Sequence, residues 1–173
     1  IQEAFAEMAN LKHSLYRLGN GTIKHIEVIP LFEQVPTIIR SVDILKEYLQ
    51  KHKKSFGFTP SYLRPYVARS DPALNSGVVP TVLAIKIGLS RYRTFEKETG
   101  VALYPIIGSA SLPFRGGLTP TSVEQFAAEY RGIRTTLLQG AFRYDFDTKD
   151  VVLAVEKLEQ LLPKAKAAII STA

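Results

Sequence analysis

The sequence predicts the α/β class, in which strands and helices alternate around a parallel sheet. Four hydrophobic runs begin near residues 22, 62, 101 and 135, and each is followed by a segment with apolar residues at helical spacing. The runs are almost continuously apolar, as is typical of parallel strands that are buried on both faces. Four such units are half of a TIM-type (βα)8 barrel, which needs about 250 residues, whereas this chain has 173. We therefore expect residues 1–173 to form a partial barrel, preceded by a helix, within a longer chain.

The first two βα units have the clearest patterns. A strand is expected over Thr22–Leu31, with Glu33 just beyond its end, and a helix over Val35–Gln50. The apolar residues of this helix recur every three or four positions, at Ile38, Ile39, Val42, Leu45 and Leu49. A second strand over Tyr62–Ala68 and a second helix over Val78–Tyr92 follow.

The third and fourth units repeat this order. A strand over Val101–Ile107 precedes a helix over Ser122–Tyr130, and a strand over Thr135–Ala141 precedes a helix over Thr148–Leu162. Thr148 is the expected N-cap of the last helix, because a threonine hydroxyl can accept a hydrogen bond from the backbone N–H groups of the first turn.

Composition limits the kinds of protein that this chain can be. It has no cysteine, which excludes disulfides and thiolate metal sites and fits the cytoplasm. No apolar run approaches the roughly 20 residues of a membrane helix, so we expect no membrane partner. The net charge of +6 could suit nucleic acid. The basic residues lack interleaved aromatics, however, and the densest cluster, Lys51 to Lys54, falls at an expected helix end, so a small anionic substrate is favoured over nucleic acid.

Charged and polar residues follow the expected strands at their carboxyl ends. In a parallel barrel these ends meet at one mouth, where active sites lie. The residues found there are Glu33, Arg69, Asp71, Arg115, Gln139 and Arg143. Charges grouped near a buried sheet require compensation by a ligand or a metal.

Two of these residues, Glu33 and Asp71, are candidate metal ligands. Both offer only oxygen donors and sit on consecutive units. Few oxygen ligands from the protein favour Mg²⁺ or Mn²⁺, which keep positions for water and substrate. The alternative is that these carboxylates form ordinary ion pairs with Arg69 or Arg40.

Arg115 is a candidate anion-binding residue, because glycines follow it in the stretch PIIGSASLPFRGGLTP. Gly116 and Gly117 would let the backbone approach an anion, and the guanidinium fork suits phosphate or carboxylate. The loop from Ser109 to Leu118 is a candidate lid. The alternative is a solvated arginine in a turn.

The histidines and serines show no pattern that predicts a catalytic role. None of His13, His25 and His52 follows a strand, so each is expected to be structural or exposed, with His13 on the first helix. The serines at or near strand ends, Ser70, Ser109 and Ser111, lack a histidine partner by any motif and are not expected to be nucleophiles.

Four blocks together carry a family resemblance. IPLFEQV, YVARSDPALNSG, PIIGSASLPFRGG and TTLLQGAFRYDF, in this order and spacing, resemble the archaeal-type branch of phosphoenolpyruvate carboxylase over Ile26 to about Asp147. The resemblance implies a (βα)8 carboxy-lyase that converts phosphoenolpyruvate and bicarbonate to oxaloacetate and phosphate with Mg²⁺ or Mn²⁺. It also implies a cytoplasmic homo-oligomer, expected to be a homotetramer.

The resemblance implies roles residue by residue. Glu33 and Asp71 match the metal ligands, and Arg115 matches the second arginine of the glycine loop, which contacts anionic intermediates. Gln139 and Gly140 match the Gln-Gly of the next strand end. The expected catalytic residues are Arg115, Arg69 and Arg143, and the expected substrate-binding residues are Arg115, Arg69, Gln139, Gly116 and Gly117.

The chain also departs from the larger members of that family. Ser109 stands where their glycine loop has its first arginine, Leu74 stands where a lysine follows their metal aspartate, and the catalytic histidine falls outside this region. The isolated chain is therefore expected to be inactive without the rest of its parent chain. Two other functions stay open: a metal-dependent barrel lyase acting on a 2-oxo acid, and a non-catalytic assembly module.

Overall fold

A computed structural model describes residues 1–10 and 26–170 of the chain. The helices are α1 (Gln2–Ala9), α2 (Val35–Ile39), α3 (Ser41–Phe56), α4 (Asp71–Ser76), α5 (Val78–Thr99), α6 (Val123–Glu129), α7 (Gly140–Tyr144) and α8 (Thr148–Leu161), with a 3₁₀ turn η1 (Pro113–Arg115). The strands are β1 (Leu31–Phe32), β2 (Tyr62–Leu63), β3 (Tyr66–Ala68), β4 (Ala102–Leu103), β5 (Ile106–Gly108) and β6 (Thr135–Thr136). The expected α/β class and the helix near the start of the chain are confirmed.

The main sheet is parallel, and its strands lie side by side in chain order. The order is β1-β3-β5-β6, and a separate parallel pair joins β2 to β4. One row of register runs through Phe32, Val67, Ile107 and Thr136. Because every pair is parallel, the carboxyl ends of all four main strands meet at one edge.

Prolines determine where the main strands begin. Pro30, Pro65 and Pro105 each stand directly before a strand, where they cannot donate to the ladder. Each of their carbonyls instead accepts a bond of 2.8 Å from the backbone N–H of a residue at the start of the neighbouring strand or just before it, Tyr66, Ile106 and Arg134 respectively. The strands expected over 62–68 and 101–107 are therefore each divided in two, into β2 with β3 and β4 with β5.

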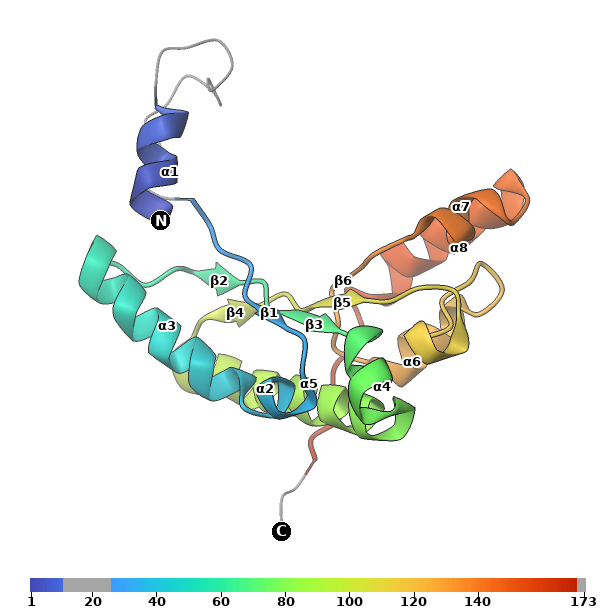
Figure 1. The fold of residues 1–173 in the computed structure, drawn as a ribbon, viewed down its shortest axis with the longest axis horizontal. Coiled ribbons are helices and arrows are strands. Elements are labelled where there is room, and N and C mark those ends of the chain that lie inside the picture. Colours follow the sequence, from blue (N-terminus) through green and yellow to red (C-terminus); the bar gives the residue numbers. More distant parts are fainter. Residues whose placement is uncertain (11–25, 171–173) are drawn as a thin grey trace.

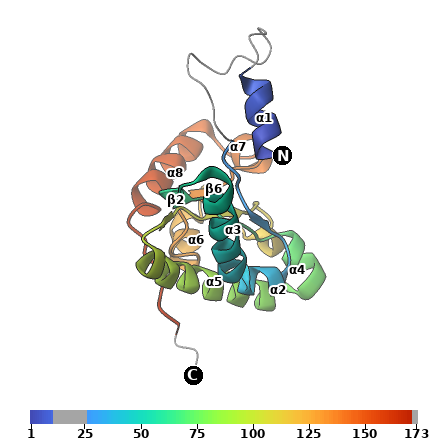
Figure 2. The ribbon, with the colours of Figure 1, turned by 90° about the vertical axis from the view of Figure 1, so that its left-hand side faces the viewer.

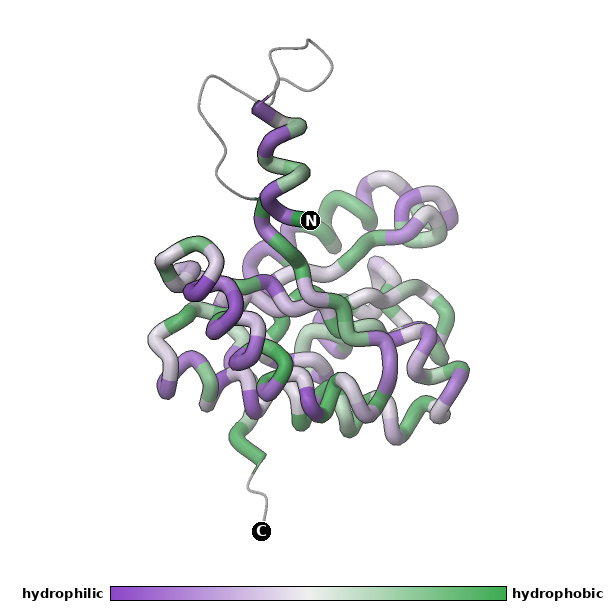
Figure 3. Tube along the Cα trace, turned by 60° about the vertical axis from the view of Figure 1, so that its left-hand side comes forward, coloured by the Kyte–Doolittle hydropathy of each residue, from purple (hydrophilic) through white to green (hydrophobic). Residues whose placement is uncertain are grey.

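Helices α2, α3 and α5 run along one side of the sheet (Figure 1), and the turned view shows the same layering (Figure 2). Phe32, Val67 and Ile107 are buried on this side together with Ile38 and Ile85. Leu31, on the opposite face of β1, is half exposed. Along the outer helices, hydrophobic and hydrophilic stretches alternate (Figure 3), as in helices that bury one face. The hydrophobic core therefore lies between one face of the sheet and the helices.

Several expected boundaries need correction. Of the strand expected over 22–31, residues 22–25 lie outside the described part, and residues 26–30 have no regular secondary structure. The helix expected over 35–50 is broken at Arg40 and continues to Phe56, and the helix expected over 78–92 continues to Thr99. Each ends at a glycine with positive φ, Gly57 at 78° and Gly100 at 71°, a conformation that costs glycine little.

The fourth unit differs most from expectation. Its strand stops at Thr136, and the region expected to continue it to Ala141 instead enters helix α7 at Gly140. Asp147, not Thr148, is the N-cap residue of α8, and Thr148 is its first helical residue. His13 and His25 lie outside the described residues. Within the described ranges, no helix is both long and apolar enough to cross a membrane.

Candidate active site at the carboxyl ends of the strands

The sheet order brings the predicted site residues to one edge. Glu33 follows β1 directly, Arg69 and Asp71 follow β3, and Gln139 follows β6 after a short gap. The turn η1, which ends at Arg115, follows β5 and packs against α4, the helix that begins at Asp71. Residues far apart in the chain are thus grouped at the carboxyl edge, where parallel sheets bind ligands.

The carboxylates of Glu33 and Asp71 lie near a common neighbour, the phenol of Tyr66. Burial raises the pKa of Tyr66, and the negative charges of Asp71 and Glu33 raise that pKa further. The Tyr66 hydroxyl lies over Gly108, so a Cβ at that position would collide with it. Both carboxylates are therefore close enough to act electrostatically on one side chain.

The donor set of this pair fits a hard divalent cation. Glu33 and Asp71 are exposed, and neither forms an ion pair within residues 1–10 and 26–170. The alternative pairing with Arg69 or Arg40 is thus not seen. No cluster of three or more His, Cys, Asp or Glu side chains that could hold a metal occurs in the same ranges. Two carboxylates with open positions suit Mg²⁺ or Mn²⁺, which keep several water or substrate ligands.

Backbone hydrogen bonds fold the loop after β5 tightly. Ala110 donates to the Arg115 carbonyl at 2.9 Å, and Leu118 donates to the Ala110 carbonyl at 3.0 Å. Gly116 and Gly117 have φ of 115° and 67°, a region that L side chains rarely adopt. A Cβ on Gly116 would also lie 3.0 Å from Ser109 Cβ. The glycines that mark this loop in the sequence are required by its backbone.

Two buried polar atoms of this loop lack partners within the described residues. They are Arg115 Nε and Ser111 Oγ. The Arg115 guanidinium carbon lies 5.6 Å from the centre of the Phe114 ring, so the side chain is placed by its own neighbour. A buried donor without an acceptor is costly, and such a group in a native protein calls for a ligand or water. The Nε atom of Arg115 is therefore buried, although the residue as a whole is partly exposed.

Arg69 occupies a different environment from Arg115. Its residue surface is only 2% exposed. Its Nε donates to the Tyr130 hydroxyl at 2.6 Å, and its Nη1 donates to the Phe114 carbonyl at 2.5 Å. Burial raises the pKa of Tyr130, while the bond from Arg69 opposes that rise. The side chain of Arg69 therefore ties α6 to the loop that carries Arg115.

The residues after β6 are more exposed. Gln139 is the N-cap residue of α7 without a side-chain capping bond, and Gly140 begins that helix. Arg143 is exposed, with its guanidinium carbon 5.2 Å from the centre of the Tyr144 ring. Closer to the sheet, the hydroxyls of Ser109 and Thr136 are 3.1 Å apart and link the loop to β6.

Sequence reasoning missed Tyr66 and Tyr130. Tyr66 was assigned to a strand interior, although its position three residues before Arg69 was a usable signal. Tyr130 is 61 residues from Arg69 in the chain, and no local pattern connects the two. Ser111 appeared only as a serine without a histidine partner.

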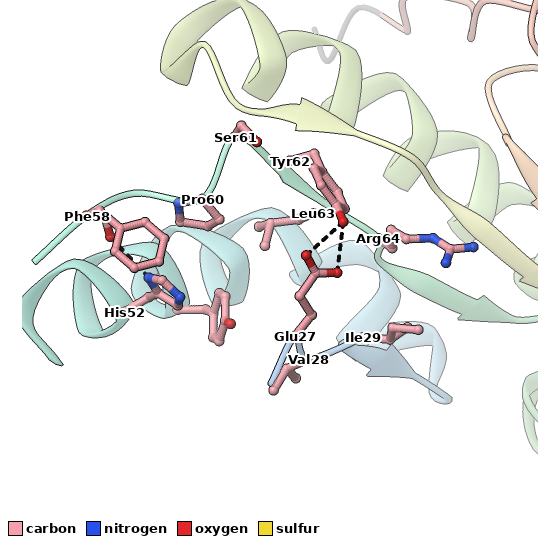
Figure 4. A pocket seen from close by; sticks show the side chains of 11 residues that line it. Glu27, Val28, Ile29, His52, Phe58, Pro60, Ser61, Tyr62, Leu63 and Arg64 are labelled. Carbon is pink, nitrogen blue, oxygen red and sulfur yellow. Dashed lines mark hydrogen bonds between the residues drawn. The ribbon is translucent and has the colours of Figure 1, made fainter. Parts of the chain in front are cut away.

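A cavity of about 230 Å³ lies near the amino ends of the strands, at the edge opposite the candidate site (Figure 4). None of the predicted site residues lines it. In it the Tyr62 hydroxyl donates to Glu27, with oxygen distances of 2.7 and 2.9 Å. The buried His52 places Nδ1 3.1 Å from the Phe58 carbonyl, between the rings of Phe56 and Phe58. These contacts are those of a packed structural histidine, as expected for His52.

Comparisons with known proteins identify relatives of this chain. The sequence pattern of the family described as phosphoenolpyruvate carboxylase matches residues 7–173. The phosphoenolpyruvate carboxylase of Leuconostoc mesenteroides is 37% identical over 171 residues, which are 99% of this chain and 34% of that protein. The corresponding protein of Pyrococcus horikoshii is 44% identical over 139 residues, 80% of this chain and 28% of that protein. That of Methanothermobacter thermautotrophicus is 42% identical over 152 residues, 88% of this chain and 30% of that protein.

The chain thus spans about a third of the length of the curated relatives that it matches. The match covers every strand end described above, from Glu33 to Gln139. The relatives include archaeal proteins, in agreement with the branch that the four sequence blocks indicated. The chain belongs to the phosphoenolpyruvate carboxylase family.

Proposed function

We propose that this chain is part of an enzyme that carboxylates phosphoenolpyruvate with bicarbonate to give oxaloacetate and phosphate. The observation that carries the proposal is the loop after β5, where the buried Arg115 Nε and Ser111 Oγ lack partners in the described part of the chain. The loop packs against the helix that begins at Asp71, beside a carboxylate pair suited to a divalent cation. An anionic, metal-bound substrate would satisfy both features.

The proposal includes the architecture of the parent chain. Four parallel strands in chain order, with helices along one side, are what half of a (βα)8 barrel contains. We infer that residues 1–173 are such a half and that the other half, with a catalytic histidine, belongs to the rest of the parent chain. A cytoplasmic homo-oligomer, the homotetramer expected from the resemblance, is part of the same proposal.

The reaction separates into two steps. An oxygen of bicarbonate attacks phosphorus, and the bond between phosphorus and the enol oxygen breaks, giving carboxyphosphate and the enolate of pyruvate. Carboxyphosphate then releases CO₂ and phosphate, which keeps the bicarbonate proton, and C3 of the enolate bonds to the carbon of CO₂. Negative charge therefore accumulates on the phosphoryl oxygens and on the enolate oxygen.

Each candidate site residue of this chain would have a separate role in these steps. Glu33 and Asp71 would hold the divalent cation, which when bound supplies positive charge near the enolate and phosphoryl oxygens. Arg115 would direct its unpaired donor at the phosphoryl group, where one positioned donor is typically worth about 3 kcal/mol in the transition state. Arg69 holds the loop beneath Arg115, while Gln139 and Arg143 would contact substrate from the β6 side. A loop that excludes water would protect carboxyphosphate from hydrolysis.

The test uses the intact parent enzyme with Arg115→Lys and Arg115→Ala. Lysine keeps the charge but loses the fork of donors, so kcat for oxaloacetate formation should fall by roughly 10²–10³, with a smaller effect on KM. Stability to urea should not change, because the buried Nε of Arg115 makes no hydrogen bond within the described residues. Arg131→Lys, at an exposed arginine, is the matched control. Near-normal kcat with a large loss of stability would show that Arg115 is a structural residue and would remove the main support for the proposal.

A further inference from the structure

A second cavity lies at the amino edge of the sheet, away from the candidate active site. Its volume is about 350 Å³, and it lies between the last turns of α5, the residues just before β5 and β6, and the segment that follows α8. Its apolar lining includes Leu89, Leu103 and Pro105. Pocket volumes of this order hold small molecules. None of the predicted site residues lines it.

The rim of this cavity is strongly basic. Four cationic side chains line it, namely Arg93, Lys97, Arg134 and Lys166, against the single carboxylate of Glu96. That carboxylate already accepts a bond of 2.8 Å from the backbone N–H of Leu103. Like charges gathered around one cavity repel each other unless an anion lies between them.

These four cations form no ion pair with any described residue, although Lys46, Lys51, Lys86 and Lys157 each pair with a glutamate elsewhere on the surface. Residues 11–25 and 171–173, which the structure does not describe, contain no Asp or Glu in the sequence. No acidic side chain of this chain is therefore paired with the cluster.

The two arginines are held in place by backbone carbonyls. Arg134 Nη1 donates to the carbonyls of Ala165 at 2.7 Å and of Ile133 and Leu162 at 3.2 Å. Arg93 Nη1 donates to the Ala167 carbonyl at 3.0 Å. Each guanidinium is thus anchored by one nitrogen, and its other nitrogens have no hydrogen bond within the described residues. Anchored arginines lose little side-chain entropy when they bind an anion.

We propose that this cavity binds a small anion that carries a phosphate group. The fork of an anchored guanidinium suits phosphate oxygens, and the two lysines add charge without fixed geometry. The apolar lining would contact a short carbon skeleton. A purely structural role, in which the arginines bind backbone carbonyls, explains one nitrogen of each arginine. It does not explain why Lys97 and Lys166 line the same cavity.

Binding is tested on the intact parent enzyme, and the variants described below separate binding in this cavity from binding at the candidate active site. The probes are inorganic phosphate, glycerol phosphate, succinate and sodium chloride at matched ionic strength, followed by calorimetry and by thermal unfolding. The two phosphate compounds should bind saturably and raise the unfolding temperature, whereas chloride should do neither. A stronger effect of succinate than of phosphate would overturn the assignment to a phosphate-bearing ligand.

Variants then locate the site. Lys97→Gln combined with Lys166→Gln should weaken binding of glycerol phosphate about tenfold or more, because charge-assisted contacts are lost. Lys53→Gln combined with Lys54→Gln, two exposed lysines on α3, is the matched control and should leave binding unchanged.

Acetylation of lysines followed by mass spectrometry gives an independent readout, in which the ligand should protect Lys97 and Lys166 but not Lys53. Equal binding by both double variants, or no protection of Lys97 and Lys166, would overturn the proposal. Neither result would bear on the carboxylase reaction.

Discussion

Replacing Tyr130 by phenylalanine in the intact parent protein would test whether the bond from Arg69 positions the loop that carries Arg115. The Tyr130 hydroxyl accepts from Arg69 Nε at 2.6 Å, and both residues are 2% exposed. Tyr130→Phe leaves a charged donor buried without its acceptor. Such a loss costs about 1.5–3 kcal/mol, because hydrogen bonds to charged groups are stronger than neutral ones. We expect the free energy of unfolding in urea to fall by that amount.

The same change should reach the active site through the loop. Arg69 Nη1 holds the Phe114 carbonyl, one residue before Arg115. Once Tyr130 no longer fixes the guanidinium, this contact can shift, and small misplacements of catalytic groups cost up to about 10² in rate. We expect kcat to fall about tenfold while KM changes less, with faster hydrogen exchange across residues 109–117. Arg69→Lys should lower kcat similarly, because lysine cannot make both bonds in this geometry.

Tyr92→Phe is the matched control for Tyr130→Phe. Tyr92 is also 2% exposed, but its hydroxyl has no hydrogen-bond partner within the described residues. Burial raises the pKa of Tyr92, and a hydrogen bond from the neighbouring Ser41 hydroxyl would oppose that rise. Ser41 Oγ instead donates to the Ile38 carbonyl at 2.7 Å, so its proton is already engaged. Removing an unsatisfied buried hydroxyl should be neutral or slightly stabilising. If both variants keep wild-type stability and kcat, the bond between Arg69 and Tyr130 does not position the loop.

Three further predictions concern the same edge of the sheet. Glu33→Gln or Asp71→Asn should raise the Mg²⁺ concentration needed for half-maximal activity at least about tenfold, the loss typical even of residues that only support a ligand. Gly108→Ala should lower the free energy of unfolding in urea by about 1–3 kcal/mol, because its Cβ would meet the Tyr66 ring. The pKa of Tyr130 is raised in the folded state, so its contribution to stability is complete below about pH 10 and is lost as the pH rises through the folded pKa. The stability difference between wild type and Tyr130→Phe should therefore shrink above about pH 10, and a constant difference in urea melts would contradict this sign.

The order of the elements could be predicted because hydrophobic periodicity is a local signal. Pro65 and Pro105 could have indicated that two of the expected strands are divided. The apolar residues on both sides of each proline favoured one continuous strand instead. The end of the fourth strand was harder to predict. Leu137 and Leu138 look like strand residues, yet they are 40% and 42% exposed and lead into α7. Apolar character alone does not tell a buried strand from an exposed connection.

The placement of most candidate site residues near strand ends could be predicted, whereas the orientation and the partners of their side chains could not. The rule that strand ends face the active site places a residue but not its side chain. Arg69 and Arg115 both follow strands in the sequence, and both were expected to bind substrate. Their partners distinguish them, because Arg69 donates from two nitrogens to groups 45 and 61 residues away, while Arg115 keeps a buried donor without a partner in the described part of the chain. A single sequence carries no record of such long-range pairs.

The partners of Arg69 also bear on the proposal that the loop of Arg115 binds an anion. A hydroxyl and a carbonyl accept hydrogen bonds from two of its nitrogens but leave its charge uncompensated, and no ion pair to Arg69 occurs within the described residues. Burying a positive charge without a counter-ion is costly, and the cost falls when negative charge approaches. Because Arg69 lies beneath the loop of Arg115, an anion bound at that loop lowers the cost of burying Arg69 without touching it. Arg69 would therefore favour an anion at the loop in two ways. Its hydrogen bonds position the loop, and its buried positive charge is stabilised when the anion is bound.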